Sequence, residues 1–192
     1  MSTQYFACVY GGASEKIDES IKQEIELLGK IIAENGFSLV YGAGNAGCMG
    51  AVARGVAENG GYVMGISPHF IKHFEGSFKC DNTVMVDTMS ERKNLMEKYA
   101  DVFIIAPGGI GTMDEFFQVL TLKYLRQINT PIIVLNINGF YDKLLELIDS
   151  LVEKNAADSS VCELYENIDS VKSPRLNNIL SEIKNTKERK GL

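Results

Sequence analysis

The segment 102–117 combines residues that suit a phosphate with residues that would repel one. It reads VFIIAPGGIGTMDEFF, so an apolar run is followed by three glycines within four residues and then by two acids. Glycine lets the backbone approach a ligand and direct N–H groups at a phosphate, and a helix N-terminus adds positive potential. The acids also have a structural explanation, because Thr112 and Glu115 have the spacing of a capping box. We expect a helix with Thr112 as its N-cap and glycines that face an anion.

A second candidate is Arg92, in the segment MSERKNLM. Residues 88–91 form another capping box, which predicts that a helix begins there. Arg92 and Lys93 follow at once, so two cations lie near the positive end of the helix dipole. Lys93 can pair with Glu97 at i+4, whereas Arg92 shares with Met96 the side that should face the protein. A cation in that place breaks a local rule, which indicates a functional role for Arg92.

A third candidate is the segment YGAGNAGCMG, in which Gly42, Gly44 and Gly47 form a GxGxxG pattern. The pattern follows an expected strand and opens an expected helix, as a phosphate-binding turn does. Three interpretations are open: a tight turn without a ligand, the edge of a nucleotide or phosphate site, and an NAD site. The NAD interpretation is the weakest, because the loop follows the second strand and the acid that should come about 20 residues later is missing.

Alternating strands and helices must position these residues. Six short apolar runs read as strands buried on both faces, and amphipathic segments such as 18–34 separate them. This alternation predicts an α/β fold, a Rossmann-like, doubly wound, mostly parallel sheet with helices on both faces, in a single domain over residues 1–192. Ligands bind such sheets beyond the carboxyl ends of the strands. The expected strands cover residues 5–10, 37–41, 62–67, 83–87, 102–106 and 131–137.

Composition narrows the function classes. The chain has 192 residues, is 45% hydrophobic and carries a net charge of −6, which argues against a nucleic-acid-binding protein. Its four cysteines are widely spaced, and His69 and His73 have no third ligand nearby, so we expect neither disulfides nor a metal site. No signal peptide or membrane span is visible, and we expect a cytoplasmic protein that does not bind membranes.

The segment EFFQVLTLKYL, residues 115–125, is apolar on nearly every side. A helix of this kind must be buried on every side. One side can pack on the sheet and the other on a second copy of the chain, so we expect a homodimer.

Together, MSERKNLM, PGGIGTMDE and YGAGNAGCMG resemble the LOG ("lonely guy") family, whose members were long labelled putative lysine decarboxylases. The resemblance covers about residues 5–180. It implies a Rossmann-like fold, a homodimer and phosphoribohydrolase activity, which splits a nucleoside 5′-monophosphate into free base and ribose 5-phosphate. Plant members act on cytokinin ribotides, and bacterial members often accept AMP.

The resemblance also implies roles for individual residues. Arg92 and Glu115 match the catalytic pair of the family. The chain departs from the family pattern at Ala43, Cys48 and Leu122, which concerns the base pocket more than the chemistry. The remaining substrate-binding candidates, from the family match and the glycine loops, are Gly42, Gly44, Gly47, Glu75, Lys93, Gly108, Gly109, Ile110, Gly111, Thr112, Met113, Asp114 and Thr121.

These residues support a mechanism without a cofactor or a metal. Cleavage of an N-glycosidic bond builds positive charge on the ribose, and a carboxylate beside the sugar stabilises that charge or activates water. The main alternative is a non-hydrolytic carrier of a nucleotide or of molybdenum cofactor, which would need the glycine loops but not the Arg–Glu pair. A lysine decarboxylase would need a lysine that binds pyridoxal phosphate, and no segment argues for one.

Overall fold

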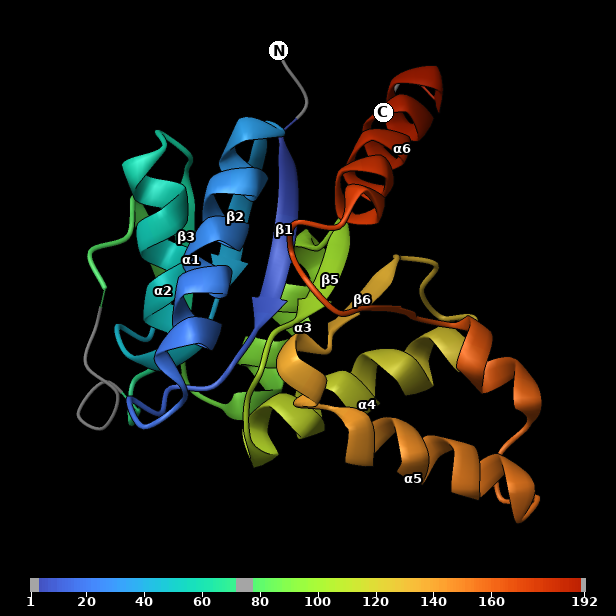
Figure 1. The fold of residues 1–192 in the computed structure, drawn as a ribbon. Helices are drawn as coiled ribbons and strands as arrows, with labels where there is room; N and C mark the ends of the chain where they lie inside the picture. The colour runs from blue at the N-terminus through green and yellow to red at the C-terminus, as the bar shows by residue number, and fades with distance from the viewer. Residues whose placement is uncertain (1–3, 72–77, 191–192) are drawn as a thin grey trace.

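Seven short strands form one sheet in the part of the chain that the computed structural model describes, residues 4–71 and 78–190 (Figure 1). All neighbouring strands are parallel, in the order β4-β3-β2-β1-β5-β6-β7. The strands are β1 (Tyr5–Tyr10), β2 (Phe37–Tyr41), β3 (Val63–Pro68), β4 (Asn82–Val86), β5 (Val102–Ile105), β6 (Ile132–Leu135) and β7 (Glu166–Ile168).

The six expected strands are confirmed; two have the expected ends, and the ends of the other four differ by at most two residues. Strand β7 was not predicted, because its three residues include a single buried apolar side chain and show no run of hydrophobicity. The predicted α/β fold with a doubly wound parallel sheet is confirmed as well.

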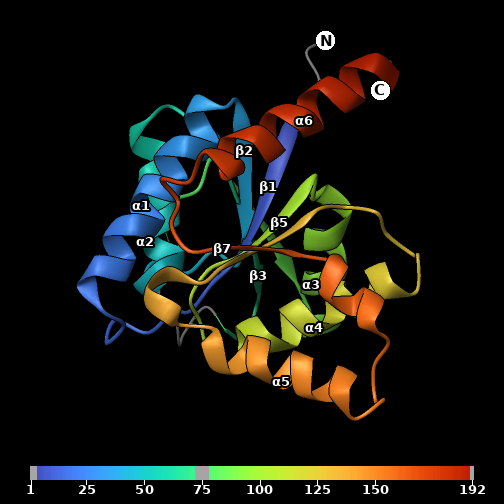
Figure 2. The ribbon, with the colours of Figure 1, turned by 45° about the vertical axis from the view of Figure 1, so that its right-hand side comes forward.

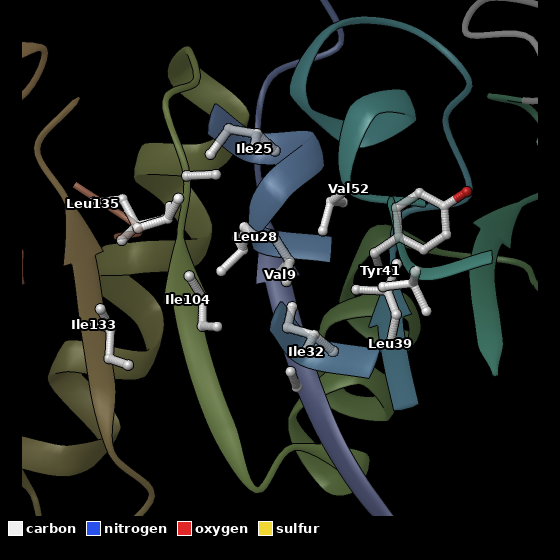
Figure 3. Close-up of a cluster of buried hydrophobic side chains, with 14 of the residues drawn as sticks. Val9, Ile25, Leu28, Ile32, Leu39, Tyr41, Val52, Ile104, Ile133 and Leu135 are labelled. Carbon is white, nitrogen blue, oxygen red and sulfur yellow. The ribbon is translucent and has the colours of Figure 1, made fainter. Parts of the chain in front are cut away.

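Helices cover both faces of the sheet (Figure 2). Helices α1, α2 and α6 pack on one face with Ala7 and Val9 of β1, whereas α3, α4 and α5 pack on the other with Cys8 and Tyr10. Figure 3 shows the first of these two clusters. The helices are α1 (Glu19–Glu34), α2 (Gly47–Glu58), α3 (Met89–Tyr99), α4 (Ile110–Tyr124), α5 (Asp142–Glu153) and α6 (Pro174–Lys190), with the 3₁₀ helices η1 (Ile137–Gly139) and η2 (Ser159–Glu163).

The strand order reverses at β1, which pairs with β2 on one side and with β5 on the other. Loops that leave neighbouring strands in opposite directions open a crevice at such a switch point. Backbone hydrogen bonds tie the loops together here: Gly12 N–H donates to Pro107 O at 3.0 Å, and Met49 N–H donates to Gly12 O at 3.3 Å. No helix among the described residues has the length and apolar character that crossing a membrane requires.

Candidate active site

A cavity of about 320 Å³ lies at this switch point, a volume in the range of small-molecule sites. The loops after β1, β2 and β5 meet there with the first turns of α3 and α4. Its lining residues are Val9, Tyr10, Gly11, Gly12, Ala13, Ser14, Gly42, Met49, Ile71, Met89, Arg92, Met96, Gly109, Gly111, Thr112 and Glu115.

Helix α4 begins at Ile110 with Gly109 as its N-cap, so the expected capping box between Thr112 and Glu115 is wrong. Glycine is an acceptable N-cap, and it allows the helix to start directly after the loop. Thr112 is therefore inside the helix, and its hydroxyl packs so tightly on the loop that a Cβ on Gly108 would lie 2.1 Å from Thr112 Oγ1. Because Thr112 and Glu115 are three residues apart, they share the helix face that lines the cavity.

Helix α3 starts as predicted. Thr88 Oγ1 accepts from Glu91 N–H at 3.1 Å, and Glu91 Oε2 accepts from Thr88 N–H at 3.1 Å, which completes the capping box. This cap fixes the first turn of α3, and Arg92 follows directly after it.

Arg92 is buried, with 5% of its surface exposed. Its Nη2 donates to Gly42 O at 3.3 Å, and its Nη1 lies 3.9 Å from Met89 Sδ. The buried Nε has no hydrogen-bond partner among the described residues. A Cβ on Gly42 would lie 1.8 Å from Arg92 Nη2, so this glycine makes room for the guanidinium. A buried cation with an unused donor in a cavity is suited to bind an anionic or polar group.

Glu115 lines the same cavity and is also buried, with 8% of its surface exposed. The charges of both residues affect the pKa of the Cys8 thiol on β1. Burial raises the pKa of Cys8 well above its ordinary value; the Glu115 carboxylate raises it further, and Arg92 lowers it. The site therefore places a carboxylate and a guanidinium, from α4 and α3, around one cavity.

The glycines after β5 leave open space beside the first turn of α4. A Cβ on Gly109 or Gly111 would meet nothing within 4 Å in the described part of the chain. Packing therefore does not require these glycines, whereas close approach of a ligand would. The first backbone N–H groups of α4 have no acceptor within the helix, and they carry the positive end of its dipole. This edge of the cavity is suited to hold a phosphate.

The GxGxxG loop contributes differently from a dinucleotide fingerprint. Gly42 lines the cavity, but Gly44 and Gly47 do not. Gly47 has a φ of 56°, and a Cβ there would lie 2.6 Å from Gly12 O, so it serves the close packing of two loops. Ala43 also has a left-handed φ, 66°, in which a side chain is strained.

Lys93 and Asp114 are partners rather than parts of the cavity wall. Lys93 Nζ lies 2.8 Å from Asp114 Oδ2, so it pairs with α4 and not, as expected, with Glu97. Glu97 instead accepts a hydrogen bond from Gln118 of α4. These two contacts join α3 to α4 and so help to fix the distance between the helices that carry Arg92 and Glu115.

The other candidates lie outside the cavity wall. Ile110 is 87% exposed, and Thr121 is exposed farther along α4. Met113 is partly buried and packs against the core cluster on the α4 side of the sheet. Gly108 supports the loop through its contact with Thr112. Glu75, like His73, lies outside the described residues.

Four apolar side chains that we did not predict also line the wall. They are Met49, Met89, Met96 and Ile71, which in the sequence look like ordinary core residues. The loop after β1 also contributes Gly11 and Gly12. Both glycines directly follow the first expected strand in the sequence, but neither was among the predicted site residues.

The architecture is that of a Rossmann-like α/β protein, and the chain belongs to the LOG family. The family model described as "possible lysine decarboxylase" matches residues 49–174. The chain is 38% identical over 148 residues to the rice protein named probable cytokinin riboside 5′-monophosphate phosphoribohydrolase LOGL5, which covers 77% of this chain and 60% of the rice protein. It thus spans about three-fifths of the length of that relative.

A bacterial relative matches over more of its length. The cytokinin riboside 5′-monophosphate phosphoribohydrolase of Mycobacterium tuberculosis is 34% identical over 165 residues, which cover 85% of this chain and 88% of that protein.

Solved structures share the fold at lower identity. The molybdenum cofactor binding protein of Rippkaea orientalis has a TM-score of 0.69 at 22% identity and covers 97% of this chain and 99% of its own. The Moco carrier protein of Chlamydomonas reinhardtii has a TM-score of 0.71 at 19% identity, with 96% and 99% coverage. At these identities the likeness concerns the fold alone.

Proposed function

We propose that this protein hydrolyses the N-glycosidic bond of a nucleoside 5′-monophosphate, AMP or a cytokinin ribotide, and releases the free base and ribose 5-phosphate. The observation that carries the proposal is the burial of Arg92 and Glu115 in one cavity at the switch point of the sheet. The phosphoribohydrolase names of the relatives support it.

The proposed mechanism divides the work among three parts of the cavity. The glycine loop after β5, residues 106–109, and the N-terminus of α4 hold the phosphate. This places the ribose beside Glu115, about one turn farther along the helix. As the bond from C1′ to the base nitrogen breaks, its electron pair goes to the base, which takes up a proton from solvent, and C1′ gains positive charge. The Glu115 carboxylate stabilises this charge or takes a proton from the attacking water, whose oxygen bonds to C1′. Arg92 orients the substrate and offsets the carboxylate charge.

A non-hydrolytic carrier is the alternative, because proteins of that kind share the fold. A carrier would use the glycine loops, but it has no evident use for a buried carboxylate, which repels a phosphate-bearing ligand. The Arg92–Glu115 pair therefore favours hydrolysis.

Phosphate should be essential to turnover. We expect kcat/KM for AMP to exceed that for adenosine by roughly 10²-fold or more, because binding energy from a remote phosphate positions the ribose in the transition state. The measurement is chromatography of the base released from each compound under identical conditions. Equal turnover of AMP and adenosine would sink the proposed role of the glycine loop.

We also propose a homodimer that buries the outer sides of α4 and α5. The inner side of α4 buries Phe116 and Val119. Tyr124 at the end of α4, the C-cap residue Leu125 and Leu147 on α5 remain exposed. Leu125, 58% exposed, would place its apolar surface in the interface. We expect light scattering to show a dimer at micromolar concentration and Leu125→Glu to shift it towards the monomer. A stable wild-type monomer at that concentration would refute the proposal.

A further inference from the structure

One buried hydroxyl reaches the glycine loop from an element that does not line the cavity. Tyr141 is 3% exposed and lies between η1 and α5, after the strand β6. Its Oη donates to Ala106 O at 2.7 Å, and the Gly108 N–H lies close enough to the Tyr141 hydroxyl to lower its pKa. The hydroxyl thus bonds the residue before Pro107 and lies near the residue after it, in the loop that leads from β5 into α4.

The ring of Tyr141 is itself held in place. Its backbone N–H donates to Asn136 Oδ1 at 2.6 Å, and Asn136 Nδ2 donates to Asp142 Oδ1 at 2.8 Å. The ring packs edge-on against Phe140, with centroids 4.9 Å apart. Burial raises the pKa of the phenol, and the nearby Cys48 thiol raises it further, so the hydroxyl remains a neutral donor. A side chain held at several points therefore presents a fixed hydrogen-bond donor to the loop.

The loop needs such a support because its own residues provide little. Gly109 and Gly111 have no Cβ, and a Cβ at either position would touch nothing in the described structure. Glycine also loses more conformational freedom on ordering than any other residue. From the opposite side, Gly12 N–H holds Pro107 O at 3.0 Å. Together with the Tyr141 bond to Ala106 O, this bond restrains the carbonyl groups of two successive residues, Ala106 and Pro107.

We propose that Tyr141 is a positioning residue that holds the Ala106–Gly109 loop in the conformation that binds the substrate phosphate. The inference rests on the proposed function, because it assigns the phosphate to this loop. A merely structural hydroxyl would contribute to stability alone. A positioning hydroxyl must also contribute to the affinity for ligands with a phosphate, and not for those without one.

The test compares Tyr141→Phe with Tyr5→Phe. Tyr5 is a matched control, because it is a buried tyrosine that loses the same hydroxyl. It is the first residue of β1, at the end of the strand that is away from the cavity. For Tyr141→Phe we expect the Kd of AMP, measured by calorimetry, to rise about tenfold, as for one lost hydrogen bond. The Kd of adenosine at millimolar concentration should stay unchanged. The KM for AMP should rise with the Kd, and kcat should change less. Tyr5→Phe should alter none of these values.

The outcomes separate the inference from the function on which it rests. A wild-type protein that binds and cleaves AMP, with the same Kd and KM in a folded Tyr141→Phe, would overturn the inference and leave the proposed function intact. Equal weakening of AMP and adenosine would also overturn it, because the hydroxyl would then stabilise the site as a whole. A wild-type protein that neither binds nor cleaves any nucleotide would overturn the proposed function, and the inference with it.

Discussion

Glu115→Gln is expected to lower kcat for AMP by roughly 10²–10⁴, equivalent to about 3–5 kcal/mol of activation free energy. Glutamine keeps the shape of the side chain but has no negative charge to stabilise the ribose and no basic oxygen to activate water. Stability should change little, because Glu115 lies in the second turn of α4 and takes no part in the N-cap. Nucleotide affinity should hold or rise, because a carboxylate no longer faces the phosphate-bearing ligand.

Glu91→Gln is the matched control. Glu91 belongs to the capping box of α3, where glutamine serves as well as glutamate, and it is exposed outside the cavity. The measurements are kcat, the Kd of AMP and the melting temperature for both variants. Near-normal turnover in a folded Glu115→Gln protein would remove the carboxylate from the mechanism and favour a carrier.

Arg92→Ala is expected to lower kcat/KM for AMP by about 10²–10³, the usual loss when a preorganised donor to a charged group is removed. Among residues 4–71 and 78–190, the guanidinium has a long bond to Gly42 O, a contact with Met89 Sδ and an Nε without a hydrogen-bond partner, so much of its donor capacity is available to a ligand. We expect the variant to remain folded, because Arg92 carries a buried positive charge near the positive end of the α3 dipole.

Arg54→Ala gives the comparison for the same change. Arg54 forms an ion pair with Glu26 at 3.3 Å, between α2 and α1 and away from the cavity. Its loss should leave kcat/KM unchanged, since a solvent-exposed pair contributes about 0–1 kcal/mol to stability. An Arg92→Ala protein that unfolded would show that Arg92 is a structural residue. A folded Arg92→Ala protein that cleaved AMP as fast as Arg54→Ala would exclude Arg92 from the mechanism.

The sequence predicted those elements whose pattern is long enough to be specific. Strands such as β1 are buried on both faces, and the stripe of α1 with Ile25, Leu28 and Ile32 is buried as the periodicity indicates. Strand β7 escaped prediction because three residues carry no pattern. The predicted start of α4 was wrong, because the spacing of Thr112 and Glu115 fits a capping box but also fits two residues three positions apart on one face of a helix. Tertiary packing of Thr112 against Gly108 decides between them.

The residues of the candidate site were likewise predictable only in part. Arg92 was identifiable because a cation on the inner side of a helix start conflicts with local rules, and the structure places it beside the Glu115 cavity wall. The methionines of that wall were not identifiable, because a methionine beside a ligand has the same sequence signature as one in a core. Tyr141 follows β6 and bonds the loop after the neighbouring strand β5, and no spacing in the sequence connects it to Ala106.

The most direct test of the account is the fate of AMP incubated with the wild-type protein in ¹⁸O-labelled water. Hydrolysis predicts adenine and ribose 5-phosphate in equal amounts, with one labelled oxygen on the sugar phosphate, because the water oxygen bonds to C1′. Chromatography with mass spectrometry measures all three quantities in one sample. AMP that binds and is recovered intact, with no adenine released, would contradict the account.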